Sequence, residues 1–366
     1  VAKAAMDTGV ATRPIEDLEA YRYSLARFAY RSSQVMGPII ERAKESPKRV
    51  VFAEGESTRV LRAVQQAVDE GIAKPILIGH PEVIAELIDE LQLRIRDGVD
   101  IEVVSPQGGD WFDDYVKDYL SIMGRKGISP AEAKSIMSTQ NTAIATVMVQ
   151  RGDADTMICG AHGRFRQHLK HVRDVIGIAD GIHDLSTVTV LSLPTGTFFV
   201  CDTHITPNPT ADEIVEMTLL AAEEARRFGI NPKVALLSHS NFGTNDLDSS
   251  VKMRTARELL NQRDPALIVD GEIHADTAIS EELRKRVLPE SVLKGQANLL
   301  VMPNLEAGHI SYGLLKTLGG GISVGPILIG AAKPVHVLTA STSVRSIFNM
   351  IAVAVADAAI YDESQR

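Results

Sequence analysis

The chain has 366 residues, 45% of them hydrophobic and 23% charged, and its formal net charge is -9. This composition is typical of a globular protein long enough for two domains, and the acidic balance excludes most nucleic-acid binders. We expect neither a membrane span nor a signal peptide, because no apolar run looks long enough for either. Cys159 and Cys201 lie within apolar runs, which favours buried free thiols and a cytoplasmic location.

Residues 1–46 are rich in alanine and predict helices interrupted at Gly9 and Pro14. Because the first residue is Val1 rather than methionine, we expect the chain to be a fragment of something longer. From residue 47 the pattern changes to short apolar runs separated by segments of helical spacing.

This alternation predicts an α/β fold with a mostly parallel sheet. The predicted strands are residues 49–53, 74–79, 101–104 and 156–159, and the clearest helices are residues 60–68 and 131–136. Ligands of such sheets bind beyond the carboxyl ends of the strands.

A β-hairpin is predicted over residues 188–201, where two apolar runs flank a Pro-Thr-Gly turn at residues 194–196. We place a second α/β domain at residues 186–325. Residues 47–185 and 326–366 then form the first domain, with a cleft between the two.

The second domain shows further regular patterns. Residues 233–237 and 266–269 predict strands, and Thr210 with Glu213 predicts a capping box at a helix start. The polar stretch 243–250 predicts a mobile loop.

Glycines and hydroxyls concentrate towards the end of the chain. An apolar strand at 297–302 precedes a helix that starts near Leu305 and ends in three glycines, 319–321. A glycine-bounded strand follows at 325–330, and four hydroxyl side chains lie within residues 339–343, before the final helix. Glycines admit close backbone approach and helix N-termini carry unpaired N–H groups, so this region suits an anionic, phosphate-bearing ligand.

A second anion site is predicted just after the strand that ends at residue 159. Arg164, Arg166, Lys170 and Arg173 place four cations around a helix start, where cations oppose the macrodipole unless an anion compensates. A solvated basic face is the alternative.

Two groups of residues imitate metal sites. His168 and His171 are three apart, but no acidic or cysteine ligand accompanies them, so we interpret them as a surface pair. Residues 270–276 contain Asp, Glu and His, and the apolar run around them indicates a turn and a helix start instead. No metal is therefore expected.

Two further pairs suggest acid–base or nucleophilic chemistry. Asp202 and His204 point to the same side of an extended segment and could form an acid–base pair, although we favour a structural hydrogen-bond pair. Ser238 and His239 are adjacent in a strand, face opposite ways and cannot form a dyad. The chain also lacks a glycine-rich dinucleotide fingerprint, a P-loop and a Cys-x-x-Cys pair, which disfavours a Rossmann dehydrogenase or an ATPase.

Five motifs together resemble the phosphate acetyltransferases and follow that family's order from about residue 47 to residue 358. They are residues 51–55 (Val-Phe-Ala-Glu-Gly), 206–211 (Thr-Pro-Asn-Pro-Thr-Ala), 270–272 (Asp-Gly-Glu), 303–308 (Pro-Asn-Leu-Glu-Ala-Gly), and 325–328 (Gly-Pro-Ile-Leu) with 333–335 (Lys-Pro-Val). The resemblance implies two α/β domains of the phosphotransacetylase and isocitrate-dehydrogenase-like kind. It also implies acetyl-CoA or CoA as the ligand and a homo-oligomer, with a dimer formed through the second domain.

Residues 4–15 look like the junction in large bacterial NADP-dependent malic enzymes, which join a malate-oxidising part to a C-terminal phosphotransacetylase-like domain. Residues 1–46 would then be that helical junction. The resemblance implies that NADP, a divalent metal and the oxidative decarboxylation of malate to pyruvate belong to the other part. No tightly bound cofactor is expected in this chain.

The active-site motif of the acetyltransferases is altered here. They usually read Ser-Arg-Gly-Cys-Ser after Lys-Pro-Val, with an acid a few positions on, whereas the matching residues here are Thr339, Ala340 and Ser346. Lys170 falls near a phosphate-binding arginine of the family, and Met123 replaces another arginine. A lost charge-assisted pair costs about 1.5–3 kcal/mol, and a lost general base costs roughly 100- to 10,000-fold in rate.

We therefore expect a regulatory domain without catalytic residues, which binds acetyl-CoA or CoA as an allosteric effector and supports the oligomer. The candidate ligand contacts are Arg164, Arg166, Lys170, Asn304, His309, Lys333, Thr339, Ser341 and Ser343. Two alternatives stay open: an active phosphate acetyltransferase that uses Thr339, and a purely structural dimerisation module.

Overall fold

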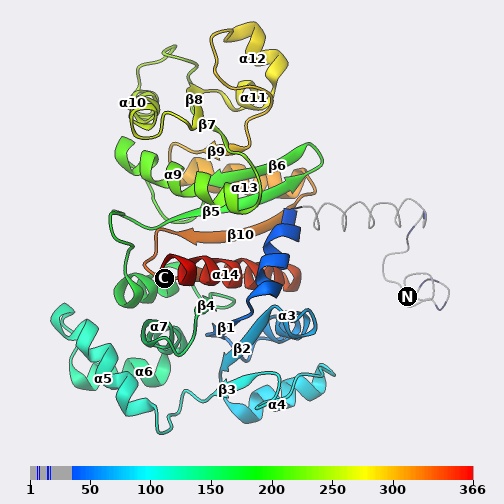
Figure 1. The fold of residues 1–366 in the computed structure, drawn as a ribbon, viewed down its shortest axis with the longest axis vertical. Helices are drawn as coiled ribbons and strands as arrows, with labels where there is room; N and C mark the ends of the chain where they lie inside the picture. Colours follow the sequence, from blue (N-terminus) through cyan, green and yellow to red (C-terminus); the bar gives the residue numbers. More distant parts are fainter. Residues whose placement is uncertain (1–5, 7, 9–14, 16, 18–34, 366) are drawn as a thin grey trace.

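The computed structural model describes residues 6, 8, 15, 17 and 35–365, and Figure 1 shows their arrangement. Most of the predicted helical junction, residues 1–46, lies outside the described residues, and residues 35–45 are helical. Two β-sheets lie one above the other with the last helix between them (Figure 1).

The first sheet is wholly parallel and has the strand order β11-β4-β1-β2-β3. Its strands are β1 (Lys48–Phe52), β2 (Ala73–Ile78), β3 (Glu102–Val104), β4 (Thr156–Cys159) and β11 (Val335–Val337). The four strands predicted before residue 160 are confirmed to within one or two residues. Their near-continuous apolar runs reflect a sheet that is covered on both faces.

Helices cover this sheet and connect its strands. They are α3 (Thr58–Asp69), α4 (Pro81–Glu90), α5 (Phe112–Met123), α6 (Pro130–Thr139), α7 (Asn141–Arg151) and α8 (Phe165–His171), with the shorter η1 (Gly124–Lys126) and η2 (Val172–Ile176). The apolar spacing that predicted a helix at residues 60–68 becomes the buried face of α3, which includes Val60, Leu61 and Val64.

The second sheet is mixed and has the order β10-β5-β6-β9-β7-β8. Its strands are β5 (Ser186–Leu193), β6 (Gly196–Cys201), β7 (Lys233–Leu237), β8 (Ile268–Ile273), β9 (Leu299–Val301) and β10 (Ile322–Ile329). The β5–β6 pair is antiparallel, which confirms the predicted hairpin, and β10 pairs antiparallel with β5. The other three pairings are parallel.

Five helices accompany this sheet in the described chain: α9 (Ala211–Arg227), α10 (Asp248–Arg263), α11 (Ala275–Ile279), α12 (Glu281–Val287) and α13 (Leu305–Leu318). The predicted capping box is confirmed at the start of α9, where Thr210 accepts from the Glu213 N–H and Glu213 accepts from the Thr210 N–H. The polar stretch 243–250 ends in the first turn of α10.

The helix start predicted within residues 270–276 is confirmed at Ala275, but residues 270–272 do not form the predicted turn. They lie inside β8, and the next helix begins only at Ala275. The Glu272 side chain is fully buried, and its Oε1 lies 3.1 Å from Nη2 of Arg254, which supplies the cation that a buried carboxylate needs. This ion pair keeps an acidic residue within a core strand.

The predicted domain boundary at residue 326 falls inside β10, which stays paired with β5 as far as Ile329. The chain therefore passes from the second sheet to the first between Ile329 and Val335, a few residues later than expected.

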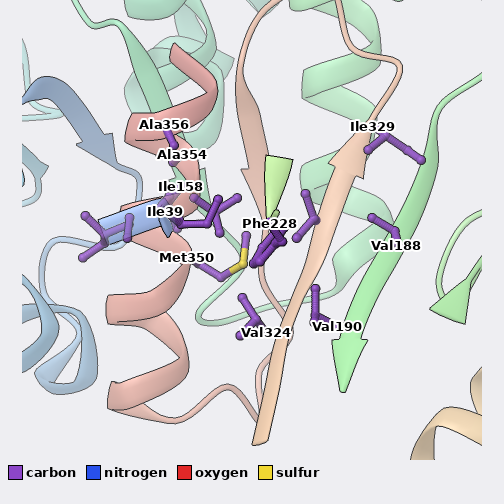
Figure 2. Close-up of a cluster of buried hydrophobic side chains, with 14 of the residues drawn as sticks. Ile39, Ile158, Val188, Val190, Phe228, Val324, Ile329, Met350, Ala354 and Ala356 are labelled. Atoms are coloured by element: carbon purple, nitrogen blue, oxygen red, sulfur yellow. The ribbon is translucent and has the colours of Figure 1, made fainter. Parts of the chain in front are cut away.

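The last helix, α14 (Val344–Ser364), joins the two sheets through one hydrophobic core. It contacts β1 and β4 of the first sheet and β10 of the second. Figure 2 shows Met350 and Ala354 of α14 in one cluster with Ile158 of the first sheet and Val324 of the second. Burial on both sides explains the helix's small and apolar residues.

By length and composition, α14 could cross a membrane, contrary to our expectation that no run was long enough. Its most apolar stretch is 61% buried inside the molecule, as a core helix between two sheets would be. Cys159 and Cys201 are buried free thiols, as predicted.

Candidate functional site

The carboxyl ends of three neighbouring strands of the first sheet, β1, β4 and β11, lead into one polar region. Glu54 follows β1, the loop 160–164 follows β4, and the turn 338–343 follows β11. Gly160 has φ 90°, and a Cβ there would lie 2.5 Å from the Leu338 carbonyl oxygen, so only glycine allows the two loops to meet.

Arg59, in the first turn of α3, fixes these loops to each other. Its Nη1 donates to the carbonyl oxygens of Ala340 at 2.8 Å and Thr342 at 2.6 Å, and its Nη2 donates to that of Ala161 at 2.7 Å. Three carbonyls on two loops thus share one guanidinium.

The hydroxyl-rich turn before α14 is held by its own side chains. Thr339 Oγ1 lies 3.1 Å from Thr342 Oγ1 and 3.3 Å from Ser341 Oγ. Ser343 is the N-cap of α14 and accepts from the Ser346 N–H at 3.2 Å. The structure thus brings together Thr339, Ser341 and Ser343 at the start of a 21-residue helix.

The second sheet contributes a cluster of rings. The His204 ring lies 5.2 Å from the His309 ring of α13 and 5.3 Å from the Phe165 ring of α8, measured between centroids. His309 Nδ1 lies 3.1 Å from the Thr203 carbonyl oxygen. Burial, together with His309 and Lys316, lowers the pKa of His204 to about 4, so its imidazole is neutral near pH 7.

Tyr312 of α13 links these rings back to the hydroxyl turn. Its ring lies 6.1 Å from that of His204, and its hydroxyl lies 3.1 Å from Ser323 Oγ of β10. Ser346 of α14 in turn donates to the Ser323 carbonyl oxygen at 3.4 Å.

These contacts form two groups, which the chain itself links through residues 161–165 and 342–346, and we call the whole set the contact ring. Its members are Arg59, Ala161, Phe165, His204, His309, Tyr312, Ser323, Ser346, Thr342 and Ala340. The ring joins the carboxyl-end edge of the first sheet to β6, α13 and β10 of the second.

Glu54 lies beneath this ring as a mostly buried acid. Its carboxylate accepts from the N–H groups of Gly160 at 2.9 Å and Ala161 at 3.4 Å. Burial nevertheless raises the pKa of Glu54 to about 7. His168 Nδ1 lies 3.7 Å from Glu54 Oε1.

His168 and His171 are not the predicted surface pair. The His168 ring is largely buried, with Nδ1 2.8 Å from Thr142 Oγ1 and Nε2 2.7 Å from the His162 carbonyl oxygen. Burial lowers the pKa of both histidines. Within the described residues, no three His, Cys, Asp or Glu side chains gather as metal ligands would.

The predicted basic cluster divides into two parts. Lys170 pairs with Asp174 at 2.5 Å, and Arg173 pairs with Asp184 at 2.5 Å, so two of the four cations have carboxylate partners. Arg164 and Arg166 are exposed beside Phe165 of the ring and form no salt bridge within the described part of the chain. Of the four predicted cations, these two arginines are therefore the ones available to bind an anion.

Two predicted ligand contacts stabilise helix ends instead. Asn304 is the N-cap of α13 and accepts from the Ala307 N–H at 2.8 Å. Lys333 Nζ donates to the carbonyl oxygens of Val149 at 3.1 Å and Gln150 at 2.9 Å, at the C-terminus of α7. Neither is a member of the contact ring.

Asp202 has a structural role, but not through the His204 side chain, whose Nδ1 lies 2.7 Å from Thr203 Oγ1. Its buried carboxylate accepts from the N–H groups of Thr187, His204, Ile205 and Thr206. A carboxylate satisfied by backbone N–H groups holds the strand-to-loop transition after β6.

The Ser238–His239 segment shows no dyad, as expected. Ser238 Oγ lies 3.2 Å from Ser250 Oγ, and the His239 carbonyl oxygen lies 2.9 Å from His274 Nε2.

Sequence reasoning missed several ring members. Arg59 bonds to carbonyls 281 and 283 residues away, which no local pattern signals. Tyr312 of α13 and Ser323 of β10 are 11 residues apart, and no pattern in the sequence pairs their hydroxyls. The contact between His204 and His309 could have been predicted. His204 follows β6, His309 lies near the start of the helix that follows β9, and β6 and β9 are neighbouring parallel strands.

Two packed α/β units, with the carboxyl ends of parallel strands leading to the contact ring between them, define a two-unit α/β protein. The chain belongs to the phosphate acetyl/butaryl transferase family, whose model matches residues 34–355. The resemblance predicted from the five motifs is thereby confirmed.

Curated relatives refine this assignment. The chain is 50% identical over 359 residues to an NADP-dependent malic enzyme of Escherichia coli (strain K12). It is 49% identical over 358 residues to an NAD-dependent malic enzyme of Rhizobium meliloti. Both matches cover 98% of this chain but only 47% and 46% of those proteins, so the chain spans about half the length of these relatives.

Among solved structures, a phosphotransacetylase from Streptococcus pyogenes superposes with a TM-score of 0.83 at 28% identity, covering 89% of this chain and 98% of that one. The predicted α/β fold with two mostly parallel sheets is confirmed by this likeness and by the strand order.

Proposed function

We propose that this chain is a phosphotransacetylase-like regulatory domain of a malic enzyme, C-terminal to the part that decarboxylates malate. It binds acetyl-CoA or CoA at the contact ring and transmits that binding without transferring acetyl groups. The observation that carries the proposal is the environment of Thr339, in a family whose members are named as acyl transferases.

A hydroxyl that acts as the nucleophile in acyl transfer needs a proton acceptor within hydrogen-bond reach. In the described chain the side-chain hydrogen-bond partners of Thr339 Oγ1 are the hydroxyls of Ser341 and Thr342. Ala340 offers no charge, and Ser346 bonds to Ser343 and to the Ser323 carbonyl. This environment supports binding rather than transfer.

The same region keeps features that suit an anionic ligand. The N-terminus of the long helix α14 lies under the hydroxyl turn, where N–H groups and the helix dipole favour negative charge. Arg164 and Arg166 lie beside Phe165 with exposed guanidinium groups. Phosphate groups of CoA are the natural partners of such cations.

Regulation requires only that the ligand prefer one of two conformations. Because the contact ring takes residues from both sheets, a ligand that touches both would favour one relative position of the two units. The relatives named as malic enzymes have a further half, which would respond to that position. NADP and a divalent metal would act in that half.

We also propose that a second copy of this chain covers one face of α13. Ile310, Leu314 and Leu318 are 60%, 56% and 81% exposed and recur every four residues, so they form one apolar stripe. Such a stripe on a two-fold axis is self-complementary, as a symmetric dimer requires.

The test of the ligand proposal is calorimetric titration of acetyl-CoA and of CoA, with a phosphate-dependent turnover assay on the same preparation. We expect saturable binding without turnover. The double variant Arg164→Ala/Arg166→Ala should bind about a hundredfold more weakly or worse, since each lost charge-assisted contact costs about 1.5–3 kcal/mol. Arg94→Ala, which changes an arginine 76% exposed and paired with Asp69, is the matched control and should bind normally.

The other outcomes select the alternatives. Turnover at rates ordinary for enzymes would support an active phosphate acetyltransferase that uses Thr339, and would overturn the regulatory assignment. If neither acetyl-CoA nor CoA binds to the unmodified chain, the result would support a purely structural dimerisation module.

A further inference from the structure

A cavity of about 300 Å³ lies away from the contact ring, between α9, the β10–β11 connection and the second half of α14. No member of the contact ring lines it. Its apolar walls include Leu220 of α9, Leu328 of β10 and Ile360 of α14. Its volume is at the small end of the range of ligand sites.

Carboxylates outnumber cations at one wall of this cavity. Arg227 of α9 lies 3.1 Å from Glu223 Oε1, 3.1 Å from Glu224 Oε2 and 3.0 Å from Asp357 Oδ1. One guanidinium therefore serves three carboxylates. Lys333 also lines the cavity, but its amino group is bound to the carbonyls at the end of α7.

Two buried polar atoms at this wall lack hydrogen-bond partners within the described residues. The Glu224 side chain is 2% exposed and its Oε1 has none. His336 is 1% exposed, and its Nε2 lies 3.2 Å from Asp357 Oδ2 without forming a hydrogen bond. Its Nδ1 accepts from the Leu328 N–H at 3.3 Å, which leaves the proton on Nε2.

Buried polar atoms are almost always hydrogen-bonded, so unpartnered ones at the wall of a cavity indicate a missing partner. Burial, and next the neighbouring Asp357, raise the pKa of Glu224, as expected of a carboxyl without enough cationic partners. A positively charged group that donates a hydrogen bond would give Glu224 Oε1 the partner that it lacks. A metal is a poor fit, because no three metal-ligating side chains gather within the described residues.

We propose that this cavity binds a small primary ammonium compound with a short apolar chain. The ammonium group donates to Glu224 and balances the excess carboxylate, while the carbon chain occupies the apolar side of the cavity. This site is independent of the contact ring, so its test does not depend on the function proposed above.

The experiment is titration of this chain with n-butylammonium, followed by calorimetry. n-Butanol and butyrate, a neutral and an anionic compound of the same chain length, are titrated in parallel. We expect saturable binding of n-butylammonium alone. Glu224→Gln, which keeps the side-chain shape but not the charge, should weaken this binding by about tenfold or more. Glu258→Gln, which changes an exposed glutamate on α10, should leave it unchanged.

Circular dichroism establishes that each variant folds. If Glu224→Gln does not fold, Ala331→Leu replaces it, because that substitution fills the cavity without touching the charged groups and should abolish binding. Equal binding of butanol or butyrate would overturn the proposal. So would unchanged binding by a folded Glu224→Gln or Ala331→Leu, or absence of saturable binding to the unmodified chain.

Discussion

Glu54 illustrates how position changes the chemistry of a single side chain. Two backbone N–H groups favour its charged form, yet burial is the larger effect and raises the pKa to about 7. An acid whose folded pKa exceeds its unfolded value binds more protons in the folded chain. Folding therefore becomes less favourable as the pH rises between those two values.

We predict that this effect disappears in Glu54→Gln. The pH range in which Glu54 affects stability runs from its ordinary pKa of 4.5 to its pKa in the folded chain, about 7. Across it, the free energy of unfolding of the unmodified chain should fall relative to the variant by about 3 kcal/mol. Urea unfolding at a series of pH values measures this difference. Glu258→Gln, on the surface of α10, serves as the control, and a difference that stays constant with pH would contradict the prediction.

Individual side chains also mark where sequence reasoning stops. Thr339, Ser341 and Ser343 could be grouped in advance because they are neighbours in one turn. Arg59 could not, because its acceptors are backbone carbonyls that come near it only after folding. Lys333 belongs to a family motif, but a motif does not fix the direction of a long side chain, and its amino group lies on α7.

At the scale of elements, α13 depends on one glycine for its position. A Cβ on Gly308 would lie 2.1 Å from the Asp202 carbonyl oxygen, so the helix and the segment after β6 approach more closely than any other residue allows. That approach brings His309 to His204. The glycine of the Pro-Asn-Leu-Glu-Ala-Gly motif therefore has a packing role.

We predict opposite effects for two substitutions on this helix. Gly308→Ala should destabilise the chain by about 2 kcal/mol or more, because a backbone oxygen must move. Gly313→Ala, where no atom lies within 4 Å of the added Cβ, should stabilise it by up to about 1 kcal/mol. Thermal unfolding of the two variants measures this difference in stability. Equal melting temperatures would contradict the packing role of Gly308.

Most strands were predictable because each is a short apolar run between polar or glycine-rich segments. The bounds of β4 and β7 agree with those predicted from the sequence. β8 was misjudged beyond residue 269, since Asp, Gly and Glu are poor strand formers. The ion pair with Arg254, on a helix that packs against the strand, explains Glu272 in the core, together with the hydrogen bonds that Glu272 accepts from Ser240 Oγ and the Gly243 N–H.

At the scale of the whole molecule, the apolar stripe on α13 determines how copies associate. We predict that the unmodified chain sediments as a dimer or larger species. Leu314→Glu should shift it to monomers at micromolar concentration, because a desolvated carboxylate at the centre of an apolar interface is strongly unfavourable. Val99→Glu, which changes a residue 67% exposed in the first unit, is the control. A monomeric unmodified chain would contradict the proposed interface.

The central position of α14 also bears on the order of folding during synthesis. The second unit, residues 186–329, is continuous in the chain, whereas the first unit needs β11 and α14, which the ribosome makes after the second unit. The unit that is begun first is thus completed second, and its half-covered sheet is meanwhile a surface that chaperones would recognise. Ribosome-bound chains stalled with residue 330 exposed should protect the second unit from protease while the first is still cut. Equal protection of both units would show that the first sheet folds without β11 and α14.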